Sequence, residues 1–156
     1  MKLYFAGPDV FRADVQAWSV QVHALCRAAG HQALVPADGT ETAAAGIYRN
    51  NLRLLGAADV VLANLNPFRG AEPDSGTCVE IGYALALGKP VIGYAADLRP
   101  LRERLQATVA AADGRPRDAG GCAVEDFGLP FNLMLAVPLR LVQGGIEAAL
   151  MVLQQT

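Results

Sequence analysis

The sequence predicts an α/β fold: a doubly wound, flavodoxin-like or Rossmann-like parallel sheet with helices on both faces. Segments with strand and helix patterns alternate along the chain from residue 3 onward. The run 60-VVLA-63 is apolar throughout, which is typical of a strand buried on both faces of a parallel sheet. The chain has 156 residues without a visible linker or internal repeat, so we expect residues 1–156 to form a single domain.

The first half of the chain has the clearer patterns. We expect strands over residues 3–6, 31–35 and 59–65, helices over 11–29 and 47–57, and a polar loop over 37–46. In the first helix, apolar residues recur at spacings of three and four on one face, namely Val15, Trp18, Val22 and Leu25. In the second helix, the expected core residues are Ile47, Leu54 and Leu55.

The second half begins with a turn-rich loop over 66–76. We then expect a helix within 75–88, a strand over 91–94, a short charged helix over 98–105 and a short last strand over 122–124. Residues 133–153 have a mostly helical pattern, broken near Pro138 and at Gly144-Gly145. Ligands of such sheets bind beyond the carboxyl ends of the strands, where the loops 6–11, 66–76 and 125–132 are expected to lie.

Composition argues against several classes of function. The net charge is -2 and Lys and Arg do not cluster, so we expect no nucleic-acid partner. The chain lacks an apolar stretch of membrane-spanning length and a signal-peptide pattern. Cys26, Cys78 and Cys122 are widely separated, which favours free thiols in a reducing cytoplasm. His23 and His31 lack metal-ligand spacing, and both the dinucleotide fingerprint and the P-loop are absent, so no metal or cofactor is predicted.

Carboxylate chemistry is what remains, and it centres on Glu80. This residue is the only charged one in the stretch 75–88, and no charged residue lies three or four positions away. A solvated helix stripe usually has charged partners at those spacings. Because burial of an ionised carboxylate is costly, we expect Glu80 to face a cavity that supplies hydrogen-bonding partners.

Asp74 is the nearest acidic partner for Glu80, and it has two explanations. With Ser75, it can simply cap the helix. Alternatively it can converge with Glu80 on one site. Six helical residues turn by about 600°, so convergence requires Asp74 to belong to the preceding loop and to fold over the helix start. An ionised carboxylate in a dry pocket is a good nucleophile toward a sugar C1 carbon.

Four segments together resemble the nucleoside 2-deoxyribosyltransferases: 4-YFAGPDVF-11, 47-IYRNNL-52, 64-NLNPFRGAEPDSGTCVEIGYALALGKPV-91 and 124-VEDFGLPFNLML-135. The resemblance implies five parallel strands and an enzyme that exchanges the base of a 2′-deoxynucleoside for another free base. It also implies a homo-oligomer, with 2′-deoxynucleosides and nucleobases as its small-molecule partners.

The same resemblance suggests residue roles. Glu80 matches the nucleophile, Tyr4 the hydroxyl that orients it, and Asp74 the acid that binds a sugar hydroxyl and supports the departing base. Asn132 matches a residue contributed by a neighbouring subunit, and Phe11 an aromatic residue near the base. Gly7, Asp9 and Gly76, which lie in the candidate binding loops or at the helix start, are further candidates for substrate contact.

Asn51 departs from part of the family pattern. Some members have an aspartate there that protonates the leaving base, whereas an asparagine is not an acid. Either Asp74 or solvent then supplies that proton, or the preferred base differs. Asn51 and the Asn-Pro-Phe-Arg-Gly insertion over 66–70 resemble the purine-preferring branch of the family.

Two alternatives compete with base exchange. The first is hydrolysis of (deoxy)nucleoside 5′-monophosphates, which needs a phosphate cradle. Arg69 and Ser75 could contribute to it, but the nearby acids Asp9 and Glu72 argue against it. The second is a non-catalytic nucleotide-binding module, which the intact set of Tyr4, Asp74, Glu80 and Asn132 disfavours.

Overall fold

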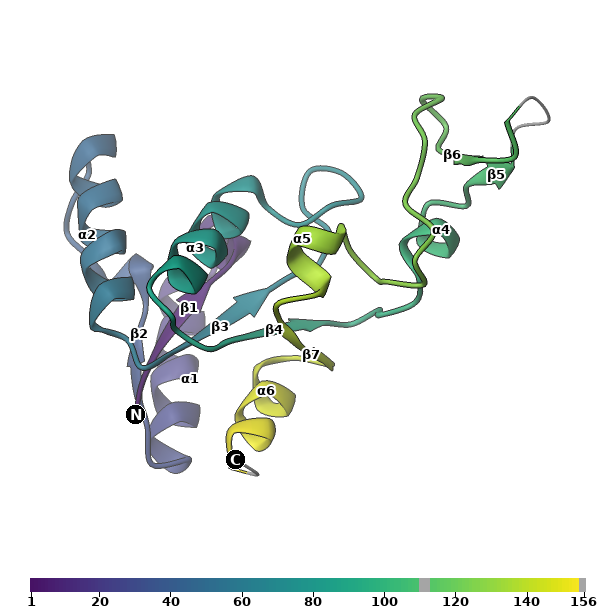
Figure 1. The fold of residues 1–156 in the computed structure, drawn as a ribbon. Coiled ribbons are helices and arrows are strands. Elements are labelled where there is room, and N and C mark those ends of the chain that lie inside the picture. Colours follow the sequence, from purple (N-terminus) through teal and green to yellow (C-terminus); the bar gives the residue numbers. More distant parts are fainter. Residues whose placement is uncertain (110–112, 155–156) are drawn as a thin grey trace.

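The computed structural model describes residues 1–109 and 113–154 of the chain. A five-stranded parallel sheet with the strand order β2-β1-β3-β4-β7 forms its centre (Figure 1). The strands are β1 Lys2–Ala6, β2 Gln32–Leu34, β3 Val60–Asn64, β4 Val91–Ala95 and β7 Arg140–Gln143. The strand order changes direction at β1 and β3, which places the ligand-binding crevice of such folds beyond the carboxyl ends of these two strands. The predicted doubly wound α/β fold is confirmed.

Helices cover both faces of the sheet (Figure 1). They are α1 Val15–Ala28, α2 Ala44–Ala57, α3 Ser75–Ala86, α4 Leu101–Arg104, α5 Leu133–Ala136 and α6 Ile146–Leu153, with 3-10 turns η1 Pro8–Phe11 and η2 Pro36–Asp38. Strand side chains alternate between the faces. From β1, Leu3 and Phe5 pack with α1 and α6, whereas Tyr4 and Ala6 pack with α2, α3 and α5.

The fifth strand corrects the prediction for residues 133–153, which we expected to be mostly helical. Helix α5 ends at Ala136, and β7 pairs in parallel with β4, with Arg140 opposite Ile92. Pro138 and Gly144 therefore bound a strand instead of interrupting a helix. A four-residue segment is too short to show its period. Its pairing with β4 selects the extended form, in which Leu141 and Val142 reach opposite faces of the sheet.

The predicted last strand over 122–124 was also wrong. Ala123 forms only an isolated bridge with Arg117, beside a small antiparallel pair of strands, β5 Thr108–Val109 and β6 Pro116–Arg117, that we had not predicted. The helix expected over 11–29 begins later, at Val15. Pro8 suits the first position of a helical turn, but Arg12 is extended and separates η1 from α1.

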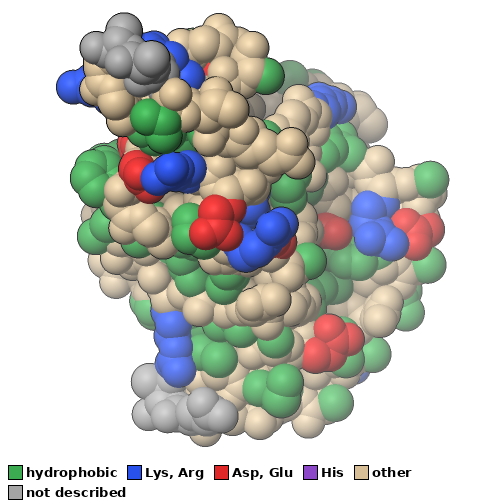
Figure 2. All heavy atoms as spheres, turned by 90° about the vertical axis from the view of Figure 1, so that its right-hand side faces the viewer, with side chains coloured by type: hydrophobic (Ala, Val, Ile, Leu, Met, Phe, Trp, Pro, Cys, Tyr) green, Lys and Arg blue, Asp and Glu red, His purple; other side chains and the backbone are tan. Residues whose placement is uncertain are grey.

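Figure 2 shows the surface from the side of α4 and the β5–β6 strands, where basic and acidic side chains are intermixed instead of forming one patch. Ion pairs in this part of the chain include Arg102 with Asp126 and Arg117 with Asp113. Among the described residues, no helix combines the length and apolar character needed to cross a membrane.

Candidate active site

Glu80 lies in the second turn of α3 and contacts a hydroxyl group that projects from the sheet. The alternation of β1 directs Tyr4 toward the face covered by α2 and α3. Its phenol oxygen donates a 2.5 Å hydrogen bond to Oε1 of Glu80. Because the Tyr4 side chain is fully buried, the packing of the sheet fixes this donor in place. The sheet therefore orients the carboxylate.

The surroundings of Glu80 act on its pKa in opposite directions. Burial raises the pKa of Glu80 above its ordinary value and the negative charge of Asp74 raises it further, while the hydrogen bonds from Tyr4 and Asn51 lower it. Burial also raises the pKa of Tyr4, and the charge of Glu80 and the hydrogen bond to it add to that rise. Tyr4 therefore keeps its proton and remains a donor to the carboxylate at neutral pH.

Asp74 is the N-cap of α3, outside the helix proper. Its Oδ2 accepts hydrogen bonds from the backbone N of Thr77 at 2.9 Å and from Thr77 Oγ1 at 3.0 Å. Asp74 also lines the same pocket as Glu80. The geometric expectation, that Asp74 belongs to the loop and folds over the helix start, is confirmed. The capping explanation holds as well, because one oxygen caps the helix.

Asn51 approaches Glu80 from α2. Its Nδ2 lies 3.5 Å from Oε1 of Glu80, the same oxygen that Tyr4 contacts. Its Oδ1 is buried and has no hydrogen-bond partner among the described residues. A buried acceptor without a partner is costly. A donor on a bound molecule would satisfy it.

The pocket in front of Glu80 has a volume of about 460 Å³. Its walls come from the loops after β1 and β2 and from α1, α2 and α3: Gly7, Val10, Phe11, Val15, Pro36, Ala37, Gly39, Glu41, Ile47, Asn51, Asp74, Gly76, Thr77 and Glu80. Small-molecule sites typically combine such apolar walls with a few polar groups. Sequence reasoning missed most of these walls. It also placed Ile47 in the core, which was wrong, because the side chain is 41% exposed at the pocket.

The glycines and Asp9 occupy different positions relative to this pocket. Gly7 and Gly76 line it. A Cβ on Gly7 would lie 2.8 Å from Cβ of Asn64, so the close approach of the two strand ends requires glycine there. Asp9 does not line the pocket. Its Oδ2 accepts a 2.7 Å hydrogen bond from Asn64 Nδ2, and it borders a smaller hollow with Tyr94 and Glu147.

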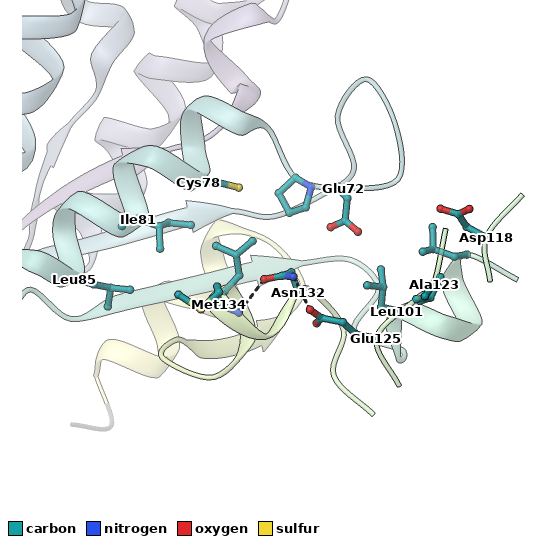
Figure 3. A pocket seen from close by; sticks show the side chains of 15 residues that line it. Glu72, Cys78, Ile81, Leu85, Leu101, Asp118, Ala123, Glu125, Asn132 and Met134 are labelled. Carbon is teal, nitrogen blue, oxygen red and sulfur yellow. Dashed lines mark hydrogen bonds between the residues drawn. The ribbon is translucent and has the colours of Figure 1, made fainter. Parts of the chain in front are cut away.

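Asn132 lies apart from Glu80 in the same chain, in a second pocket of about 820 Å³ shown in Figure 3. It caps α5, where its Oδ1 accepts from the backbone N of Met134 at 3.0 Å. Its Nδ2 donates to Oε1 of Glu125 at 2.7 Å, and Oε2 of Glu125 accepts from the backbone N of Leu133. The structure therefore holds the Asn132 amide in a fixed orientation at the surface.

A family model described as nucleoside 2-deoxyribosyltransferase matches residues 3–134. The chain belongs to the nucleoside 2-deoxyribosyltransferase family. The resemblance of the four motif segments to this family is thus confirmed, and the family consists of enzymes that act on nucleosides and bases.

A similar solved structure agrees with this assignment. A 2-deoxyribosyltransferase from Leishmania mexicana has a similar structure, with a TM-score of 0.84, 37% identity, and coverage of 99% of this chain and 97% of that chain. A Schizosaccharomyces pombe protein described only as uncharacterized is 32% identical over 94% of this chain and 80% of its own length. A CMP N-glycosidase from Clostridium botulinum covers 100% of both chains with a TM-score of 0.54, but at 14% identity it shows the fold alone.

The donor groups near Glu80 do not form a metal centre. Within the described ranges, no group of three or more His, Cys, Asp or Glu side chains could hold a metal ion. The polar groups around the pocket are carboxylates, an amide and hydroxyls, which suit hydrogen bonding to a sugar or a base.

Proposed function

We propose that this protein exchanges the base of a 2′-deoxynucleoside for another free base, with Glu80 as the covalent nucleophile. The observation that carries the proposal is the pairing of a partly buried carboxylate with a fully buried tyrosine hydroxyl beside a pocket, in a chain of this family. The pocket volume of about 460 Å³ lies in the range of small-molecule sites.

The hydrogen bonds to Glu80 distinguish its two oxygens. Tyr4 and Asn51 both donate to Oε1, and among the described residues no donor contacts Oε2. Oε2 therefore has its lone pairs available to attack C1′ of the sugar. In this step the O–C1′ bond forms, the glycosidic C–N bond breaks, and its electron pair leaves with the base, which takes up a proton.

The second step reverses the first with a different base. A nitrogen of the incoming base attacks C1′, the ester bond breaks, and its electrons return to the Glu80 carboxylate. The incoming base loses a proton to solvent or to Asp74. Two successive inversions at C1′ give net retention of configuration. Apolar walls such as Val10 and Val15 would limit the access of water, which would otherwise hydrolyse the ester.

Asp74 and Asn51 take supporting roles in this proposal. Oδ2 of Asp74 is engaged in capping α3, so the other oxygen, Oδ1, is the group that would accept a hydrogen bond from a sugar hydroxyl. The unpartnered Oδ1 of Asn51 would accept a hydrogen bond from an N–H group of the base. Since Asn51 has no proton to give as an acid, Asp74 or solvent protonates the leaving base.

A neighbouring subunit would complete the site. Asn132 lies in a different pocket from Glu80 of its own chain, which supports the proposal that it reaches a Glu80 pocket from a second copy of the chain. Several large apolar residues are exposed. Met134 and Val137, close to Asn132 in sequence, are 72% and 70% exposed, and Val79 on α3 and Leu87 just after it are 63% and 47% exposed. Exposed apolar surface of this kind marks interaction sites, which supports a homo-oligomer.

An exchange assay tests the proposed function. Deoxyinosine and deoxyuridine serve as donors, each against adenine and cytosine as acceptors. We expect exchange in wild-type protein, faster with purines because Asn51 and the 66–70 insertion resemble the purine-preferring branch. We expect no exchange by Glu80→Ala, which should still fold. Near-native exchange by that variant would contradict the proposal.

The competing activity is hydrolysis of deoxynucleoside 5′-monophosphates. The cation of Arg69 is the feature that favours it, because among the described residues its guanidinium contacts aromatic rings and no carboxylate. Incubating wild-type protein with deoxyadenosine or with its 5′-monophosphate, without an acceptor base, separates the two activities. Rapid release of adenine from the monophosphate alone would replace the transferase proposal with the hydrolase.

A further inference from the structure

Phe11 lines the Glu80 pocket, but its own segment does little to hold it. It is the last residue of η1, a four-residue 3-10 turn that contains no buried residue. The ring is 58% exposed. An aromatic ring on so short a turn needs contacts from elsewhere to keep one orientation.

Those contacts come from the loop between β3 and α3. The rings of Phe11 and Phe68 stack with centroids 5.3 Å apart and an interplanar angle of 13°. The guanidinium carbon of Arg69 lies 4.7 Å from the Phe68 centroid and 5.1 Å from the Phe11 centroid. Both distances lie within the range of a cation–π interaction. One cation therefore contacts both members of a stacked pair.

The backbone of Arg69 is unusual. Its φ angle is +54°, in the left-handed region that residues other than glycine rarely adopt, and Gly70 follows with a φ of +153°. Such conformations persist where the surroundings compensate their cost. Among the described residues, the Arg69 guanidinium forms no hydrogen bond or ion pair. The interactions that accompany its left-handed backbone are therefore its contacts with the two rings.

We propose that Phe68 and Arg69 are positioning residues that hold the Phe11 ring as the wall on which the nucleobase stacks. The inference rests on the proposed function, because it assumes that a base occupies the pocket. Arg69 and Phe68 do not touch the reacting atoms. They act through Phe11, which lines the pocket and whose ring stacks on Phe68. Loss of the stack would weaken binding of every planar base and leave the Glu80 chemistry intact.

The test uses variants that are compatible with the backbone conformation. Arg69→Asn removes the guanidinium and tolerates the left-handed conformation. Arg69→Lys keeps a cation but loses the planar group. Phe68→Leu keeps an apolar side chain without a ring. Arg99→Asn is the matched control, because Arg99 is an exposed arginine paired with Asp97. Calorimetric titration with adenine measures base affinity without requiring turnover, and steady-state exchange supplies KM and kcat.

We expect Arg69→Asn and Phe68→Leu to raise the Kd for adenine and the KM for donor and acceptor by about tenfold, with kcat changed less than about twofold. Arg69→Lys should recover part of the affinity, and Arg99→Asn should match wild type. Unchanged Kd and KM in both Phe68→Leu and Arg69→Asn would overturn the inference, as would a wild-type protein that does not bind adenine.

Two further outcomes distinguish the role of Phe68 and Arg69 from the proposed base exchange and from phosphate binding. Adenine binding that depends on Arg69 in a protein without exchange activity would uphold the stacking wall and contradict the proposed function. A loss confined to deoxynucleoside 5′-monophosphates, with adenine binding unchanged, would assign Arg69 to a phosphate and overturn the inference.

Discussion

Replacing Tyr4 with phenylalanine removes one hydroxyl group and keeps the ring that packs between the sheet and α3. That hydroxyl donates a 2.5 Å hydrogen bond to Glu80 from a fully buried side chain, so solvent has no direct route to replace it. A hydrogen bond to a charged group contributes about 1.5–3 kcal/mol. Since about 1.4 kcal/mol corresponds to a factor of ten, we expect kcat/KM at neutral pH to fall by about 10- to 150-fold.

The same substitution should change the pH dependence of activity. The Tyr4 hydrogen bond lowers the pKa of Glu80 against the effect of burial, so its removal raises that pKa further. Only the ionised carboxylate is a nucleophile. The acid limb of the kcat/KM profile should therefore shift to higher pH in Tyr4→Phe than in wild type.

Stability should follow the same linkage. A carboxyl group whose pKa is raised in the folded state binds more protons there than in the unfolded chain, so stability falls as pH rises through the raised pKa. Tyr4→Phe enlarges this fall. The loss in free energy of unfolding caused by Tyr4→Phe should be small below the ordinary pKa of glutamate, where Glu80 is protonated in the folded and the unfolded state. At neutral pH the loss should reach about 1.5–3 kcal/mol.

Tyr94→Phe is the matched control for these measurements. Tyr94 is only 4% exposed, it lies in β4, and no hydrogen bond to its hydroxyl is found among the described residues. Urea unfolding and initial exchange rates, both measured across pH, compare the two variants. Parallel pH profiles for Tyr4→Phe and wild type, or equal effects of the two substitutions, would refute the assigned role of Tyr4.

Three other predictions concern the same site. Glu80→Gln should abolish exchange yet raise the free energy of unfolding at neutral pH, because it removes a partly buried charge; equal or lower stability in urea would count against the burial argument. Thr77→Val removes one hydrogen bond to Asp74 from a side chain that is 1% exposed, so denaturation should show a loss of about 1 kcal/mol together with a higher KM. Mixing inactive Glu80→Ala with inactive Asn132→Ala should restore about a quarter of wild-type activity in a dimer after random subunit exchange. No recovery after confirmed exchange would exclude a shared site.

The sequence predicted those parts of the fold in which buried residues form a recognisable apolar pattern along a short segment. The segments 3–6 and 60–63 are apolar throughout because β1 and β3 are covered on both faces. Strand β7 was assigned to a helix because its few residues show no decisive period. Its state depends on pairing with β4, a contact with a segment distant in the sequence.

The candidate site also contains residues that a local sequence pattern indicates and residues that depend on distant contacts. Glu80 was predictable because a lone carboxylate in an apolar helix needs partners, and helix geometry then required Asp74 to lie in the loop. The apolar face of α2 was also recognisable, but its pattern does not say whether Ile47 meets protein or an open pocket. The stacking of Phe11 on Phe68 joins two loops that only the sheet brings together, so no local pattern indicates it.

Covalent trapping tests the central claim, that Glu80 forms an ester with the sugar, most directly. A 2-fluoro-2-deoxy nucleoside slows breakdown of the ester, so wild-type protein incubated with it should gain one fluorodeoxyribosyl mass on the peptide that contains Glu80. Glu80→Gln, which conserves the shape of the side chain, should gain none. A label on another residue, or unlabelled wild-type protein that has released the base, would contradict the account.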